Sequence, residues 1–308
     1  MKKILFCILA SFILFACNQT NKNEIIEVEK TLKMSDLFLS KEMIAAYSNQ
    51  SRDTSGKPGK NYYTNTYDVK IDAELDVKTR KITGKETIKY FNNSPDTLDR
   101  IILKIDADIF KKGNIRDYQV PQNDIHSGVN LSKIFVEGTD ITKNTERIKN
   151  ENSLLTILFP EKIHPKSTAE LEINWDFVLN VSTFRMGTYD SDNFFVAYWY
   201  PQPAVYDDVI GWCDIPYTGM AEFYNDYGNY DVSITVPAGY NVWSTGLLQN
   251  PDKIYKPEII EKYQKSLKTD SVIHVITKED IEKNPFSFKT QKIHTYLKRK
   301  ICPDLLSE

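Results

Sequence analysis

The chain has 308 residues with 39 basic and 42 acidic side chains, so it is mildly acidic. No basic cluster with interleaved aromatic residues occurs in it, and we therefore exclude a nucleic-acid partner, which would be held through clustered positive charge. The four cysteines do not form a disulfide framework.

The amino terminus has the pattern of a bacterial lipoprotein leader. Two lysines precede an uncharged run from Ile4 to Ala16, and Cys17 follows this run directly. The run is too short to span a membrane, and a small residue before the cysteine suits cleavage. We therefore predict a signal peptide over residues 1–16, with Cys17 lipidated by a diacylglycerol and a third acyl chain such as palmitate. The alternative is an ordinary signal followed by a coincidental cysteine.

No second apolar run approaches the length of a membrane span. We therefore expect the lipid to be the only membrane anchor, and we expect the protein in the cell envelope, at the outer membrane of a Gram-negative bacterium. Cys7 would leave with the leader, so Cys213 and Cys302 are the remaining thiols. They are expected to be inert and apolar, and a bond between them is left open.

Residues 17–60 are predicted to be a polar tether. Positions 18–33 are rich in Asn, Lys, Glu and Thr, which favours an extended chain. Apolar positions between residues 34 and 47 allow one short helix, and the Gly-Lys-Pro-Gly sequence at 56–59 would end it.

From residue 61 onward the hydrophobic period changes to two. Val69, Ile71 and Ala73 alternate with charged residues, which predicts a strand with one buried face. Similar runs predict further strands at 82–91, 98–105, 169–177, 193–200, 230–236, 240–244 and 272–276. One helix is expected to start at Pro257 and to lie over a sheet edge. We predict one mainly β domain over residues 61–297, with one or two short helices in the whole chain.

Three stretches of this domain resemble one known family. The first comprises Tyr-Asp-Val at 67–69, Gly-Lys-Glu-Thr-Ile at 84–88 and Asn-Asn-Ser-Pro-Asp-Thr-Leu at 92–98. The second comprises Tyr-Trp-Tyr-Pro at 198–201, Val-Tyr-Asp-Asp at 205–208, Gly-Trp-Cys at 211–213, Glu-Phe-Tyr at 222–224 and Tyr-Gly-Asn-Tyr-Asp-Val at 227–232. The third runs from Ile-Thr-Val-Pro at 234–237 to Thr-Gly at 245–246. Together they are similar to the amino-terminal domain of the aminopeptidase N family of gluzincin zinc metallopeptidases.

The resemblance implies a large, antiparallel, saddle-like β-sandwich that forms one wall of a catalytic cleft and does no chemistry alone. It places Tyr198 and Trp199 near that cleft, and Glu222 is the third residue that we assign to its wall. Family members often carry Gln or Glu where Tyr198 stands, and this residue helps to hold a substrate amine.

The zinc-binding motif of the family is absent from this sequence. A peptidase of this type needs His-Glu-x-x-His on a helix, and none of the four histidines is followed by Glu. We therefore predict no catalytic residue, no metal ligand and no cofactor in this chain, although full-length family members bind zinc. Residues 298–308 show no resemblance to the family, which favours a truncated or frame-shifted peptidase gene product.

Several patterns imitate functional sites. The Asp-Ser-Asp-Asn sequence at 190–193 resembles a calcium loop but lacks its glycine and glutamate, so a solvated turn is expected. Asp207 and Asp208 are interpreted as turn-capping or salt-bridging residues rather than as paired catalytic carboxylates. His274 is expected to be hydrogen-bonded within a strand.

The sequence thus predicts a lipid-anchored member of a zinc aminopeptidase family that is inactive by itself. Two other hypotheses stay open. The chain is an envelope-displayed β module that binds a peptide, or it is a docking partner for a separately encoded catalytic domain.

Overall fold

A computed structural model describes residues 39–182, 185–220, 223–287 and 292–299. The chain forms two compact units, Met1–Lys60 and Asn61–Glu308. Within the described residues, no helix has the length and apolar character that crossing a membrane requires. The leader, Cys17 and the tail 300–308 lie outside the described residues.

The first unit contains the helix α3, Lys41–Ser48. The side chain of Ser40 caps it by accepting a 3.2 Å hydrogen bond from the Met43 N–H, which supplies a partner that the first helical turn lacks. After α3 the chain folds back so closely that a Cβ on Gly59 would lie 2.2 Å from the Gln50 carbonyl oxygen. Only glycine fits this approach.

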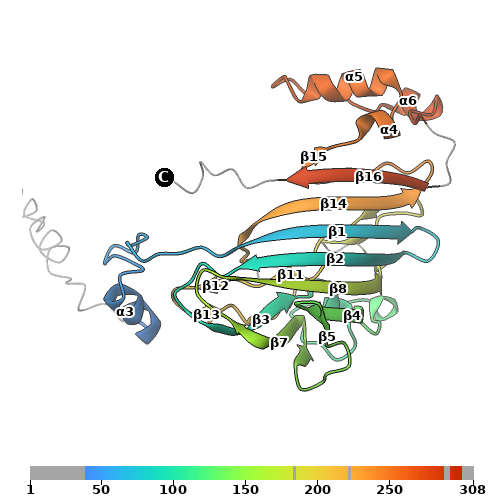
Figure 1. Cartoon of the computed structure of the whole chain (residues 1–308). Helices are drawn as coiled ribbons and strands as arrows, with labels where there is room; N and C mark the ends of the chain where they lie inside the picture. The colour runs from blue at the N-terminus through green and yellow to red at the C-terminus, as the bar shows by residue number, and fades with distance from the viewer. Residues whose placement is uncertain (1–38, 183–184, 221–222, 288–291, 300–308) are drawn as a thin grey trace, which may run out of the picture. The chain divides into compact units, whose positions relative to one another are not determined.

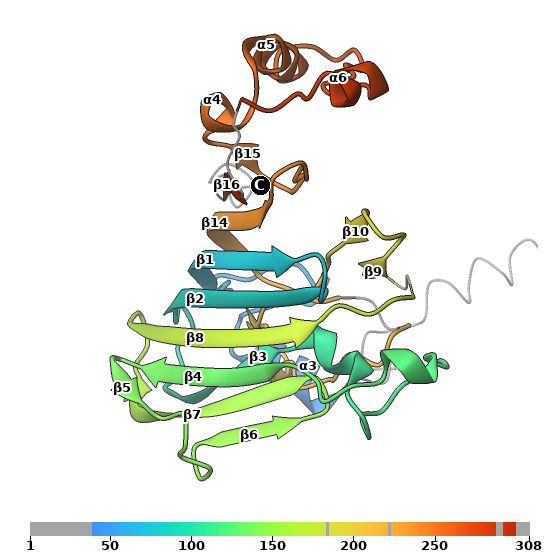
Figure 2. The same ribbon diagram turned by 90° about the vertical axis from the view of Figure 1, so that its right-hand side faces the viewer.

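The second unit is mainly β, as predicted, and contains two principal sheets (Figure 1). The eight-stranded sheet has the order β15-β16-β14-β1-β2-β8-β4-β5. Its strands are β1 Thr66–Asp76, β2 Lys81–Phe91, β4 Asn130–Val136, β5 Thr139–Asp140, β8 Thr168–Val178, β14 Tyr227–Pro237, β15 Leu247–Leu248 and β16 Lys292–Arg299. Figure 2 shows β14, β1, β2, β8 and β4 following one another across this sheet.

The second principal sheet has four strands in the order β11-β3-β7-β6. They are β3 Leu98–Lys104, β6 Ile148–Glu151, β7 Leu154–Ile163 and β11 Gln202–Pro203. Two small hairpins pair β9 Gly187–Thr188 with β10 Phe194–Phe195, and β12 Tyr206–Asp207 with β13 Gly211–Trp212. Short 3-10 turns, η2 Asp106–Phe110 and η3 Gln122–Asp124, connect β3 to β4.

The apolar residues whose alternation predicted the strands form the core. In β1, β2 and β8 every second side chain is buried, and these residues pack with the inward side chains of β3 and β7 in a single cluster. Trp175, Tyr67, Tyr90 and Phe110 are among its largest fully buried members. The two sheets are therefore the layers of a β-sandwich.

One strand pair departs from the antiparallel prediction. β1 runs parallel to β14 from Thr66↔Tyr227 to Glu74↔Thr235, whereas its other neighbour, β2, is antiparallel. The period of two is the same in both arrangements, because it depends on which face is buried and not on the direction of the partner. The sequence pattern therefore could not reveal the mixed sheet.

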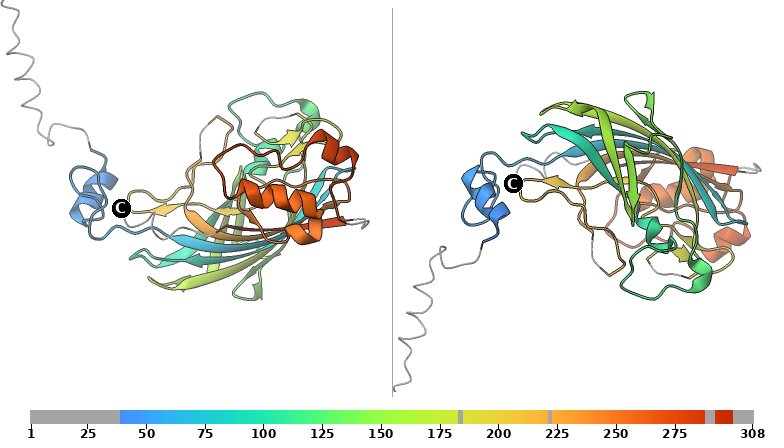
Figure 3. Two further views of the ribbon diagram at one scale, coloured as in Figure 1. Left: turned by 90° about the horizontal axis from the view of Figure 1, so that it is seen from above. Right: turned by 90° about the horizontal axis from the view of Figure 1, so that it is seen from below.

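Three helices follow β15, and they are α4 Pro251–Ile254, α5 Pro257–Ser266 and α6 Lys278–Glu282. They lie together beyond the β15–β16 edge, as Figures 1 and 3 show. Val236, Ile254, Tyr255, Ile259 and Phe286 form a second apolar core there. The prediction of a helix that begins at Pro257 and lies over a sheet edge is confirmed.

The strands predicted at 240–244 and 272–276 are wrong, since neither segment pairs with another strand. Val272 is 85% exposed. Val275 and Ile276 are consecutive residues, yet both pack against the second core, whereas consecutive residues of a strand point to opposite faces. His274 accordingly does not lie on a strand. Of the run predicted at 193–200, only Phe194–Phe195 forms a strand.

Candidate functional site

Tyr198 lies in an aromatic cluster on the segment that connects β10 to β11. Its ring stacks on Phe223 with 4.2 Å between centroids and lies 5.9 Å from Tyr217. The guanidinium group of Arg185 lies 5.9 Å from the Phe223 ring. The backbone of Tyr198 is in the left-handed region, with φ of 54°, which is uncommon for a residue with a side chain. Tyr198 thus combines close ring stacking with an uncommon backbone conformation.

Trp199, its neighbour, belongs to different surroundings. The indole packs edge-on against Trp175 at 5.6 Å and against Tyr200 at 5.2 Å, and so it joins the main core. Because Trp175 is fully buried on β8, Trp199 anchors the connecting segment to the eight-stranded sheet. Of the two adjacent residues assigned to the cleft wall, only Tyr198 lies among the rings of the 217–223 segment.

Two other predicted residues cannot be placed. Glu222 lies outside the described residues, although Phe223 beside it belongs to the aromatic cluster. Cys17 is likewise outside them. Cys213 is a buried thiol with 6% of its surface exposed, while Cys302 lies outside the described residues, so a bond between the two stays a hypothesis.

A chain of hydroxyl groups connects β1 and β14 with the segment after Trp199. Tyr200 donates to Tyr230 at 3.2 Å, Tyr230 donates to Tyr67 at 3.2 Å, and the Gln202 amide donates to the Tyr67 oxygen at 3.0 Å. Tyr67 donates in turn to the main-chain oxygen of Asp226 at 3.0 Å. Burial raises the pKa of Tyr67 and of Tyr200, so both hydroxyls stay protonated and serve as structural donors.

Charged groups lie close to these hydrogen-bonded tyrosines. Lys104 is 7% exposed, and its ammonium donates to the Tyr224 carbonyl oxygen at 2.6 Å. Burial and the nearby Asp207 carboxylate raise the pKa of Asp226 to about 7, and the charge of Lys104 opposes this shift. Burial also raises the pKa of Asp106 to about 6. Two carboxyl groups near one ammonium group thus titrate closer to neutrality than usual.

Glu86 is a carboxylic acid inside the main core. It is fully buried at an inward position of β2 between Ile71 of β1 and Ile173 of β8, and neither carboxyl oxygen has a hydrogen-bond partner among the described residues. Burial alone raises its pKa well above the ordinary value. Glu86 was not predicted to be buried, although it lies between Ile82 and Ile88 in the alternation of β2.

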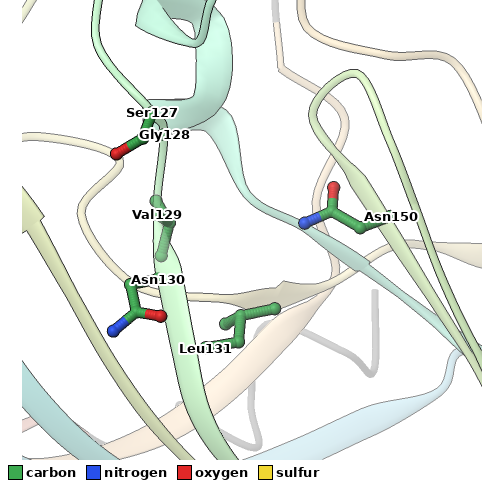
Figure 4. A pocket seen from close by; sticks show the side chains of 6 residues that line it. All are labelled: Ser127, Gly128, Val129, Asn130, Leu131 and Asn150. Carbon is green, nitrogen blue, oxygen red and sulfur yellow. The ribbon is translucent and has the colours of Figure 1, made fainter. Parts of the chain in front are cut away.

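A surface hollow lies at the start of β4. Its volume is about 320 Å³, and Figure 4 shows its lining, in which Asn150 of β6 extends toward Gly128 and Val129. The main-chain N–H of Val129 donates to the buried Asp108 carboxylate at 2.6 Å, which fixes the loop. Ser127, Asn130 and Asn150 are the polar side chains that line it, and no acidic or basic side chain is among the described residues of the lining.

Asp190 and Asp207 both cap turns, as the sequence pattern predicted. Asp190 accepts hydrogen bonds from the N–H groups of Asp192 and Asn193, at 2.9 and 2.8 Å. Asp207 caps its turn by accepting from Val209 at 2.9 Å and from Ile210 at 2.7 Å. Across the described part of the chain, no group of three or more His, Cys, Asp or Glu side chains is arranged to hold a metal ion.

Comparison with known proteins gives limited similarity. No family model matches the sequence, and no curated protein matches it. Among solved structures, the M1 zinc metallopeptidase from Deinococcus radiodurans is similar, with 12% identity and a TM-score of 0.37 over 79% of this chain and 41% of that one. A mutant of that enzyme bound to a Tyr-Ser-Ala substrate gives a TM-score of 0.36, with 12% identity. This chain therefore spans less than half the length of the structures that it matches, and the likeness is coarse.

Proposed function

We propose that this chain is a lipid-anchored β-domain of the kind that walls the substrate cleft of a zinc aminopeptidase, and that it does not hydrolyse peptides by itself. The sequence resemblance is the basis of the proposal. The absence of His-Glu-x-x-His from the sequence supports the proposed lack of peptide hydrolysis, because the two histidines of this motif bind the zinc ion in such enzymes.

One structural observation supports the proposal most directly. The stretches that carry the sequence resemblance are far apart in the chain, yet they contact one another. Asp96 of the Asn-Ser-Pro-Asp turn accepts a 2.8 Å hydrogen bond from the Tyr206 hydroxyl of the Val-Tyr-Asp-Asp stretch. Tyr67 of β1 lies opposite Gly228 of β14 and receives a hydrogen bond from Gln202. The shared residues therefore form one structural unit.

The first experiment measures zinc content and aminopeptidase activity of the purified full chain. Zinc would be quantified by atomic emission, and hydrolysis would be followed with a panel of aminoacyl fluorogenic substrates, with and without a chelator. We expect neither stoichiometric zinc nor turnover. Stoichiometric zinc with chelator-sensitive turnover would overturn the proposal.

The anchor requires a separate experiment. We expect the wild-type chain, expressed with its leader in a Gram-negative host, to partition into the detergent phase after phase separation, because several acyl chains are attached at Cys17. The Cys17→Ser variant should partition into the aqueous phase. If both forms partition alike, the chain is not anchored through Cys17.

Exposed apolar side chains favour a second candidate, which is docking of a separately encoded catalytic domain. Tyr189 is 79% exposed, Ile215 64%, Phe195 60% and Tyr227 57%, and all four belong to the segment from β9 to β14. Such side chains suit an interface. This function predicts that the isolated chain self-associates, and light scattering that shows a monomer at high concentration would count against it.

A further inference from the structure

A groove runs along one edge of the four-stranded sheet. β3 forms its first side through Asp99, Arg100 and Ile102, and the β12–β13 hairpin forms the other through Tyr206 and Trp212. Figure 1 shows this hairpin beside the start of β3. The volume of the groove is about 330 Å³, which is within the range of sites that hold small ligands or peptide side chains.

The edge of β3 that faces the groove is only partly covered. β11 pairs with Lys104 and Leu103, and the Ala204 N–H then donates to the Ile102 carbonyl oxygen at 2.8 Å. Beyond Ala204 the chain leaves β3 to form β12. No strand among the described residues continues the line of β11 toward Leu98.

The main-chain groups of Arg100 face this uncovered edge. Arg100 lies opposite Leu158 of β7, and the Leu158 N–H donates away from β3, to the Arg147 carbonyl oxygen at 2.8 Å. Arg100 and Leu158 are therefore a non-hydrogen-bonded pair, in which the N–H and C=O of each residue point outward. Ile102 lies two residues further along β3, so its main-chain groups point to the same side as those of Arg100. This agrees with its bond to Ala204. The edge thus presents a donor and an acceptor to an added strand.

The surroundings of the edge are acidic and aromatic. Asp99 and Asp214 line the groove, and Asp96 lies next to it as the acceptor of the Tyr206 hydroxyl. The rings of Tyr206 and Trp212 are edge-on with centroids 5.2 Å apart. Carboxylates beside aromatic faces attract ammonium and guanidinium groups.

Among the described residues of the lining, Arg100 is the one with a basic side chain, and it already binds Asp99 through Nε at 2.9 Å. Both side chains of this pair are about half exposed, at 47% and 51%. Exposed pairs of this kind contribute little stability, so an incoming cation can compete for Asp99.

We propose that the β3 edge binds an extended, basic segment of a partner protein, which adds to the four-stranded sheet as a strand beyond the end of β11. Main-chain bonds to Arg100 provide affinity, and the carboxylates select lysine or arginine in the added strand. The uncovered edge runs from Leu98 to Ile101, with a register shift between Leu98 and Arg100, and it accommodates a strand of roughly four residues. The inference rests on this edge alone and is independent of the family resemblance.

The test uses the full chain, purified in detergent, and the labelled peptide acetyl-Lys-Val-Lys-Val-Lys-amide, with binding followed by fluorescence anisotropy. Two further peptides separate the two contributions. One carries N-methyl groups on both valines, which removes main-chain donors and keeps the charge, and the other has Glu in place of each Lys. We expect the methylated peptide to bind about tenfold more weakly, as the loss of buried hydrogen bonds requires. The Glu peptide should not bind.

Protein variants locate the site. Asp214→Lys should weaken binding of the Lys peptide about fivefold, because it places a like charge beside the incoming cation. Glu282→Lys is the matched control, since it makes the same charge change at an exposed residue of α6, and it should leave binding unchanged. Circular dichroism verifies that both variants are folded.

Three outcomes would overturn the proposal. They are no binding of the Lys peptide at about 1 mM, equal binding of the methylated peptide, and equal effects of the two substitutions. A concentration-dependent dimer that Asp214→Lys abolishes, seen by sedimentation, would assign the edge to a second copy of this chain and would also overturn the basic-peptide proposal.

Discussion

The indole ring of Trp175 lies directly over the backbone of Gly84, its partner across the β2–β8 pairing. A Cβ placed on Gly84 would be 2.2 Å from Cζ2 of the indole. Gly84 begins the Gly-Lys-Glu-Thr-Ile stretch of the family resemblance, and the contact gives a physical reason for glycine there. A residue with any side chain would displace the largest fully buried ring of the core.

Gly84→Ala should therefore destabilise the domain by about 1–3 kcal/mol, the usual cost of overpacking a core. Urea unfolding followed by circular dichroism would measure it. The same substitution in a Trp175→Leu background should cost clearly less, because the smaller side chain leaves room for the new methyl group. Equal costs in both backgrounds would show that the indole is not the cause.

Glu86 should make the stability of the fold depend on pH. Its pKa is raised in the folded state, so the folded protein retains the proton to a higher pH than the unfolded chain does. The free energy of unfolding therefore falls as pH rises above the ordinary glutamate pKa of 4.5, by up to about 1.4 kcal/mol per pH unit for one proton. Glu86→Gln, which carries no titrating proton, should remove this part of the decline.

Urea titrations between about pH 5 and pH 8 would test this, a range in which the ordinary carboxylates of the unfolded chain are already ionised. Glu161→Gln serves as the control because Glu161 is exposed. This variant should show the same slope, that is, the same fall of the free energy of unfolding with pH, as the wild type. Asp106 and Asp226 also have raised pKa values and contribute to the same decline, so a residual slope is expected in the Glu86 variant. An unchanged slope would contradict the prediction.

Asn92 should be the most sensitive residue of the turn between β2 and β3. It is fully buried, its amide donates to the Asp96 carbonyl oxygen at 2.8 Å and to the His164 carbonyl oxygen at 3.1 Å, and its side-chain oxygen accepts from the Ser94 hydroxyl at 2.6 Å. Asn92→Ala would leave buried groups without partners and should cost about 3 kcal/mol. Pro95→Ala changes an exposed residue of the same turn and should lower the stability far less. Thermal unfolding of both variants would measure the two losses of stability.

Tyr198 and Trp199 should respond differently to truncation. Trp199→Ala removes a ring packed on the main core and should lower stability by about 3 kcal/mol. Tyr198→Ala removes only ring stacking with Phe223 and Tyr217, which is worth about 1 kcal/mol. Comparable losses in denaturant unfolding would mean that Tyr198 is as much a structural residue as its neighbour.

The fold could be predicted where burial on one face determines the sequence. Val69, Ile71 and Ala73 alternate because one face of β1 meets the core, and Pro257 marks a helix start because it needs no N–H partner. The partner of a strand is not encoded locally, so the parallel β1–β14 pair was not predicted. The run at 272–276 failed because its four apolar positions also suit a loop that packs against a core.

The candidate site was less accessible to sequence reasoning than the fold. The residues Tyr198 and Trp199 were found through the resemblance, but their opposite surroundings depend on which rings the distant segments at 175 and 217–223 bring to them. Glu86 was overlooked because a charged residue in an alternating pattern is normally assigned to the exposed face. Its register between two apolar inward positions was the available signal.

The parallel pair of β1 and β14 also has a kinetic consequence. β1 is the first strand of the domain, and one of its edges stays without a partner until the ribosome has produced the chain as far as β14. Contacts between such distant parts of a sequence form slowly, because much chain entropy is lost before any bond is gained. A domain that closes late remains unfolded longer after synthesis, and this delay suits a polypeptide that we expect to be threaded through a membrane before it folds.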